Sequence, residues 1–98
     1  MISREGRVCR IEGEVTLDTV PRILETIRPM IDDGVDTVDC SGVHTLDSTA
    51  LALLFSCKRY AQAENHPFSV IGLPASLHSL AELYGVADLL PGMAAANP

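Results

Sequence analysis

Hydrophobic residues recur along this chain with two different spacings. Polar and apolar residues alternate over residues 7–12, and short apolar-rich stretches follow at residues 36–40 and 68–71. A period of two residues is typical of β-strands. Residues 2–5 form one more candidate strand, which could pair antiparallel with residues 7–12. The pattern therefore predicts three strands and a possible fourth, and Gly13 is expected to end the strand over residues 7–12.

Between these strands the apolar spacing lengthens to three or four residues, which predicts amphipathic helices. The first helix is expected to begin near Asp18 or Thr19 and to close at residues 32–34, with Pro29 causing a kink or a frayed last turn. The second runs from about residue 48 to residue 63. The third covers residues 75–84, with Leu77, Leu80, Ala81 and Tyr84 facing inward and Gly85 as its stop. Residues 86–90 could form one more helical turn or a short strand.

Strands that alternate with helices predict an α/β fold with a small mixed sheet of four to five strands, with the helices packed mainly on one side. The chain has 98 residues, which suits a single domain. We expect that domain to span residues 1–92 and residues 93–98 to form a C-terminal tail.

The second helix has two contrasting faces. Asp47 or Ser48 lies where its N-cap is expected, because side-chain oxygens of these types accept a backbone N–H at a helix start. At 100° per residue, one face is suited to the core and carries Ala50, Leu53, Leu54, Cys57 and Ala61. The opposite face carries Ser48, Ala52, Phe55, Ser56, Arg59 and Gln62. A phenylalanine among small and polar residues is typical of a docking face, although it could also pack under a neighbouring loop.

The charge and the cysteine content of the chain argue against several classes of function. The formal net charge of −6 disfavours binding to nucleic acid or to an anionic bilayer. No apolar run approaches the ~20 residues that span a bilayer, and the start lacks a signal-peptide core, so we expect a cytoplasmic protein without direct membrane insertion. Cys9, Cys40 and Cys57 lack the spacing of a zinc site and are expected to be buried thiols. Neither a metal nor a cofactor is predicted.

Two motifs carry a family resemblance. Residues 47–51, Asp-Ser-Thr-Ala-Leu, resemble the Asp-Ser-(Ser/Thr)-Gly-Leu signature of STAS domains, the modules of anti-sigma-factor antagonists and sulfate transporters. Residues 11–15 resemble the Leu-x-Gly-Glu-Leu segment near the start of these domains. Ala50 stands where the regulatory pattern usually has Gly, which counts against a phosphorylation switch.

Residues 51–54, 80–86 and 89–91 resemble more closely the STAS subunit family (MlaB) of the Mla phospholipid-transport ABC complex. The resemblance implies a cytoplasmic subunit, peripheral to the inner membrane through its complex, that binds the ATPase subunit of the transporter and helps to maintain outer-membrane lipid asymmetry. It places Ser48 at the partner interface and Glu14 close to it.

Three functions remain open on the sequence. In the first, a non-enzymatic subunit docks on the ATPase through Asp47, Ser48, Thr49, Ala52, Phe55 and Arg59. In the second, an anti-sigma-factor antagonist binds an anti-sigma factor kinase and is phosphorylated at Ser48, which would add negative charge in the middle of the interface. In the third, which has the least support, Ser48 is an enzymatic nucleophile with His44, in a polar loop, or His78 as its base.

An acidic run occupies the connection after the first helix. Asp32, Asp33, Asp36 and Asp39 could form a patch that faces a partner, but a solvated loop is the usual structure for such a run.

Overall fold

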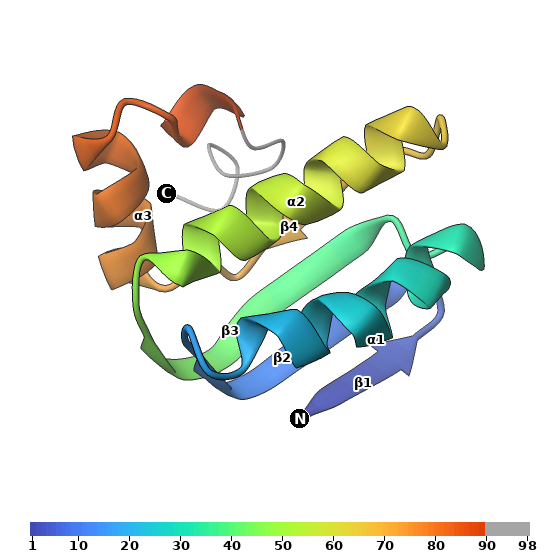
Figure 1. Ribbon diagram of the computed structural model, residues 1–98, viewed down its shortest axis with the longest axis horizontal. Helices are drawn as coiled ribbons and strands as arrows, with labels where there is room; N and C mark the ends of the chain where they lie inside the picture. The colour runs from blue at the N-terminus through green and yellow to red at the C-terminus, as the bar shows by residue number, and fades with distance from the viewer. Residues whose placement is uncertain (90–98) are drawn as a thin grey trace.

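The computed structural model describes residues 1–89 and shows four strands and three α-helices, followed by a short 3₁₀-helix (Figure 1). The elements are β1 (Ile2–Glu5), β2 (Val8–Val15), α1 (Val20–Asp32), β3 (Thr37–Leu46), α2 (Thr49–Ala63), β4 (Ser69–Ile71), α3 (Ala75–Leu83) and η1 (Ala87–Leu89). Residues 86–90 are expected to form either a helical turn or a short strand. The part of this stretch that lies in η1 forms a helical turn. The predicted tail over residues 93–98 lies outside the described part of the chain.

The strands form one mixed sheet in the order β1-β2-β3-β4. β1 pairs antiparallel with β2, as predicted, whereas β2–β3 and β3–β4 are parallel pairs. Parallel neighbours need a crossover connection, and α1 and α2 provide these crossovers. Both helices lie on the same face of the sheet, and α3 crosses near the start of α2 (Figure 1). The predicted α/β fold class is confirmed.

The core lies between the sheet and the α1–α2 layer. Its largest fully buried side chains are aliphatic and come from strands and helices alike: Ile11, Ile27, Ile31, Leu53, Leu54, Leu77, Val35, Val38 and Val70. Cys9, Cys40 and Cys57 are free and buried among them, as predicted. Burial raises the pKa of the Cys9 thiol to about 11, and of the Cys40 and Cys57 thiols to about 12.

Two strands are longer than the sequence pattern predicts. β2 continues through Gly13 to Val15, so the prediction that Gly13 ends the strand is wrong. Gly13 has φ of +96°, and the β2–β3 register shifts on either side of residues 12–13. Glycine adopts such an angle readily, and the extra residues at both shifts belong to β3, so β2 continues through Gly13.

β3 continues to Leu46, six residues beyond the predicted end at residue 40. Val43 is buried and still points into the core, while Ser41, His44 and Thr45 are exposed. The buried Cys40 and Val43 lie three positions apart, because the β2–β3 register shifts here, and this breaks the period of two that would reveal the strand. His44 therefore lies in a strand and not in a loop.

The helices agree with the predicted pattern, with two differences. α1 runs through Pro29 to Asp32, and the backbone N–H of Asp33 still bonds the Pro29 carbonyl at 3.1 Å, so the last turn is intact. In α3, Leu77 and Ala81 are buried, but Tyr84 follows the helix and is 59% exposed, so the prediction that Tyr84 faces inward is wrong.

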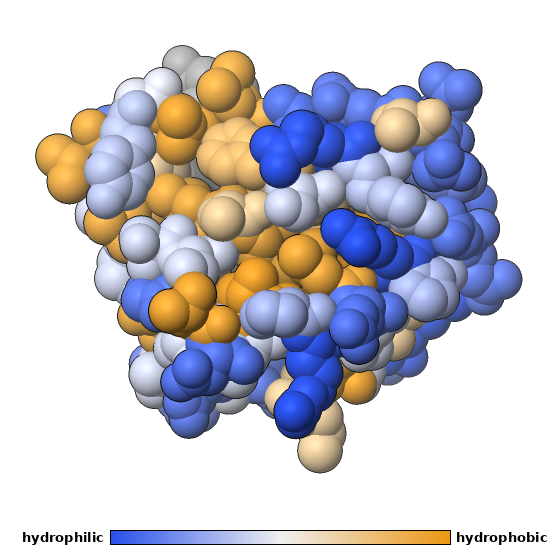
Figure 2. Space-filling model, viewed as in Figure 1, coloured by the Kyte–Doolittle hydropathy of each residue, from blue (hydrophilic) through white to orange (hydrophobic). Residues whose placement is uncertain are grey.

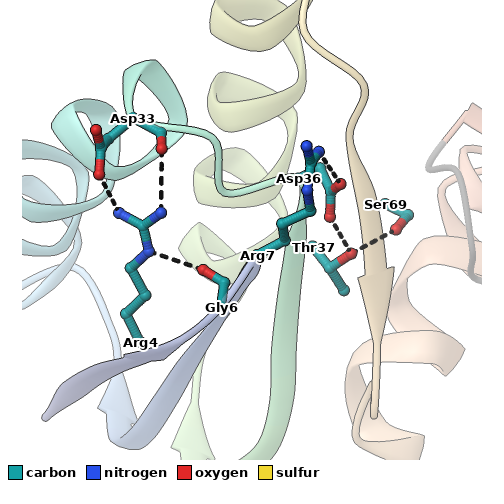
Figure 3. A network of polar contacts seen from close by, with 7 residues as sticks. All are labelled: Arg4, Gly6, Arg7, Asp33, Asp36, Thr37 and Ser69. Atoms are coloured by element: carbon teal, nitrogen blue, oxygen red, sulfur yellow. Dashed lines mark hydrogen bonds and ion pairs between the residues drawn. The ribbon is translucent and has the colours of Figure 1, made fainter.

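The acidic run after α1 is held by the chain's own cations and hydroxyls (Figure 3). The Arg4 guanidinium contacts the Asp33 carboxylate at 2.7 Å, and that of Arg7 contacts Asp36 at 3.2 Å. The Thr37 hydroxyl donates to Asp36 at 2.9 Å. These contacts join β1 and the β1–β2 turn to the segment between α1 and β3, and the Asp33 side chain stays 79% exposed to solvent while it makes them.

Candidate docking site at the start of helix α2

The C-terminal ends of β2 and β3 position the site. These strands are parallel, and Val15 pairs with Leu46, so the segments that follow each strand lie at the same edge of the sheet. Leu17 follows β2, while Asp47 and Ser48 follow β3 and lead into α2. Residues that lie thirty positions apart in the sequence therefore meet at this edge.

Ser48 occupies the N-cap position of α2, as predicted, but Asp47 makes the capping contacts. The Ser48 side chain is exposed and makes no capping hydrogen bond. Instead, Asp47 Oδ1 accepts the backbone N–H of Thr49 at 2.9 Å and also the Thr49 hydroxyl. The Ser48 hydroxyl is thus left available at the positive end of the helix dipole.

The second oxygen of Asp47 reaches the segment before α1. Asp47 Oδ2 accepts the backbone N–H of Leu17 at 3.0 Å, and the Asp47 N–H donates to the Val15 carbonyl at 3.3 Å. The bonds from Thr49 and Leu17 stabilise the carboxylate and hold the pKa of Asp47 below its usual value. The Leu17 side chain is 70% exposed beside this junction. Leu17 is not among the residues predicted from the sequence, because nothing in its local pattern distinguishes it.

The two predicted faces of α2 are observed. Ala50, Leu53, Leu54, Cys57 and Ala61 are all buried, and Leu51 joins them. On the opposite face Ser48, Ala52 and Arg59 are exposed, whereas Phe55 is half-buried against the core cluster. Asp47 and Thr49 are also half-buried.

We call the set Asp47, Ser48, Thr49, Ala52, Phe55 and Arg59 the docking site. All six residues belong to α2 or to the two positions before it, so the fold presents them together. Arg59 closes the set one turn beyond Phe55, and its guanidinium donates to the Ser56 hydroxyl at 3.4 Å. Their arrangement offers the exposed Ser48 hydroxyl, a half-buried phenylalanine and the exposed Arg59, a combination that suits protein–protein contact.

The histidines that the sequence offered as possible bases are engaged elsewhere. His44 Nδ1 lies 3.1 Å from the Thr45 hydroxyl, and His78 Nδ1 lies 3.2 Å from the Glu82 carboxylate. Across residues 1–89, no hydrogen bond joins Ser48 to either histidine, and no three His, Cys, Asp or Glu side chains are grouped so as to hold a metal ion.

Exposed apolar side chains also gather outside the docking site. Leu83, Tyr84 and Leu89 are 76%, 59% and 52% exposed, and they lie on or just after α3 and η1. Figure 2 shows apolar residues over α3 and η1 at the upper left, and a second band between α1 and α2. Within the described chain, no helix has the length and apolar character needed to cross a membrane.

A hollow of about 620 Å³ lies between β2 and the start of α1. Its lining mixes the acidic Glu12, Glu14 and Asp18 with the basic Arg22. Glu14, expected near the interface, lies in β2 and lines this hollow.

The family model described as "Mlab, STAS domain" matches residues 2–91 of the chain. The chain belongs to the STAS domain family. Among curated relatives, the anti-sigma-B factor antagonists of several Staphylococcus aureus strains are 28% identical over 83 residues, which is 83% of this chain and 77% of theirs. The predicted resemblance to STAS domains and to anti-sigma-factor antagonists is therefore confirmed.

Solved structures share the STAS fold. The unphosphorylated anti-sigma factor antagonist SpoIIAA aligns with a TM-score of 0.68 at 18% identity, covering 88% of this chain and 80% of its own. The phosphorylated form of the Bacillus protein gives a TM-score of 0.65 at 18% identity, covering 90% and 85%. A putative anti-sigma factor antagonist from Thermotoga maritima gives 0.72 at 10% identity, covering 93% and 82%. At these identities the likeness concerns the fold alone.

Proposed function

We propose that this STAS domain is an anti-sigma-factor antagonist that binds an anti-sigma factor through the docking site and is switched by phosphorylation of Ser48. The observation that carries the proposal is the exposed Ser48 hydroxyl, which takes no part in capping because Asp47 caps α2 in its place. The curated relatives, which are anti-sigma-B factor antagonists, support the same function.

Phosphorylation at this position has a physical basis as a switch. A phosphate on Ser48 would gain from the N-terminal dipole of α2, and it would be opposed by the adjacent Asp47 carboxylate. It would add about −1.5 to −2 charges at neutral pH within the docking site, at the start of α2. Release of the partner is the expected output. The domain itself acts as a binding module without enzymatic activity, and the kinase supplies the catalysis.

Intact mass spectrometry tests the modification. The purified domain is incubated with ATP and the anti-sigma factor kinase of the same organism. We expect the mass increase of one phosphate on the wild-type protein and on Thr49→Val, and none on Ser48→Ala. Failure of the wild-type protein to gain phosphate, or a gain by Ser48→Ala, would contradict the switch.

A second function is favoured by the family model, whose description names Mlab. In this alternative the docking site binds the ATPase of an inner-membrane ABC transporter for phospholipid, and the domain is peripheral to that membrane through its complex. Ala50 also favours it: the residue is buried at the α2 start, where the regulatory STAS pattern usually has Gly.

Co-expression separates the two functions. The tagged domain is produced once with the organism's anti-sigma factor and once with the ATPase encoded beside an ABC permease. Our proposal predicts a stable complex with the anti-sigma factor only. A stoichiometric complex with the ATPase alone would establish the second function instead.

A further inference from the structure

We propose that the Asp47 carboxylate fixes the segment around Leu17 against the start of α2, and that Leu17 is an apolar anchor for the same protein partner that contacts Ser48. The anchor rests on the proposed function, because it assumes that a partner docks at the start of α2. The contacts of the Asp47 carboxylate with Thr49 and Leu17, which we call the clamp, are a property of the free domain.

The clamp needs both oxygens of a carboxylate. Oδ1 accepts the N–H and hydroxyl of Thr49, and Oδ2 accepts the N–H of Leu17 at 3.0 Å. An asparagine at position 47 offers one acceptor oxygen and one NH₂ group. The NH₂ group would face an N–H donor at either Thr49 or Leu17, so one of the two connections would be lost.

The segment before α1 is ordered by further bonds. The Thr19 hydroxyl accepts the Thr16 N–H at 2.9 Å and donates to the Glu14 carbonyl at 3.1 Å. The Thr16 carbonyl accepts the Val20 N–H at 2.9 Å. The exposed Leu17 side chain is therefore carried on a backbone that is already fixed, which lowers the entropy lost on binding.

The surroundings of Leu17 define the chemistry of the partner. Leu17 is 70% exposed, Asp18 follows it in the sequence, and the Asp47 carboxylate is bonded to its N–H. We infer a partner protein with an apolar pocket for Leu17, bordered by lysine or arginine side chains. Such an arrangement combines a buried apolar anchor with a rim of complementary charge.

Hydrogen exchange of the free domain tests the clamp without any partner. The variants are Asp47→Asn and Asp18→Asn, each of which removes one negative charge; Asp18 follows Leu17 in the sequence. We expect faster exchange of the Leu17 or Thr49 amide in Asp47→Asn and unchanged exchange of both in Asp18→Asn. Unchanged protection of both amides in Asp47→Asn would overturn the clamp.

Affinity for the organism's purified anti-sigma factor tests the anchor. We expect Leu17→Ala to weaken binding by about tenfold or more, whereas Leu83→Ala, an equally exposed leucine on α3, changes it less than about twofold. Equal binding by Leu17→Ala and wild type would overturn the anchor. If the wild-type domain binds no anti-sigma factor, the proposed function and the anchor on this partner both fail, and the exchange experiment still decides the clamp.

Discussion

The Tyr60 hydroxyl of α2 donates to the Asp32 carboxylate at the end of α1, at 2.8 and 2.9 Å from its two oxygens. Arg28 of α1 lies over the Tyr60 ring at 5.8 Å from its centroid. These contacts join the two helices that cover the sheet, so they connect the body of the domain to the helix that carries the docking site.

The bond to Asp32 raises the pKa of Tyr60 above its usual 10.0, with burial as a further cause. The neutral phenol is favoured in the folded state, so this contribution to stability is complete below pH 10.0 and is lost as the pH rises through the native pKa. In the variant Tyr84→Phe, Tyr60 is the remaining tyrosine. Absorbance titration of this variant should show that the midpoint pH of tyrosine ionisation is lower in the unfolded protein than in the folded protein. The same midpoint in folded and unfolded protein would contradict this prediction.

Acid should weaken the polar network at the start of β3, at the end of the sheet away from the docking site. Hydrogen bonds from Thr37 and Arg7 hold the pKa of Asp36 below its usual 3.8. Its contribution is therefore present above the unfolded pKa and is lost as the pH falls through the lower native value. Denaturant unfolding at a series of pH values should show a shallower acid decline for Asp36→Asn than for wild type. Identical slopes would show that Asp36 takes no part in the acid response.

The three cysteines should be unreactive in the folded protein. Burial raises their pKa values to about 11 or 12, so almost no thiolate exists near neutral pH. A maleimide reagent at about pH 8 should label the native domain only slowly and should label all three thiols quickly in denaturant. Rapid labelling without denaturant would show that the core opens more readily than its packing indicates.

The centre of the α1–sheet contact should be sensitive to truncation. Ile27 is fully buried, so Ile27→Ala should lower the free energy of unfolding by about 2–5 kcal/mol through lost burial and a cavity. Leu83→Ala, at a site that is 76% exposed, should change it by less than about 0.5 kcal/mol. Urea unfolding measures both variants, and equal losses would contradict the assignment of the core.

The sequence predicted α2 well because its pattern is local. An uninterrupted helical spacing separates Leu53 and Cys57 from Ala52 and Arg59, and the structure buries the first pair and exposes the second. The end of β3 was missed because the register shifts there place the buried Cys40 and Val43 three positions apart, which breaks the period of two. Gly13 was misread as a stop because a strand irregularity has the same local signature as a turn.

The role of Leu17 could not be read from the sequence. It depends on a hydrogen bond to Asp47, thirty residues later, and on the parallel pairing that brings the ends of β2 and β3 together. The assignment of capping to Asp47 and not to Ser48 also depends on side-chain orientation, because both residue types suit an N-cap.

The central claim is that a partner docks on the start of α2, at Ser48. The most direct test is the affinity of Ser48→Glu for the organism's purified anti-sigma factor, measured beside Ser76→Glu, which changes another exposed serine near a helix start. We predict that Ser48→Glu stays folded and loses at least about tenfold in affinity, whereas Ser76→Glu binds like wild type. Wild-type affinity in Ser48→Glu would contradict the claim.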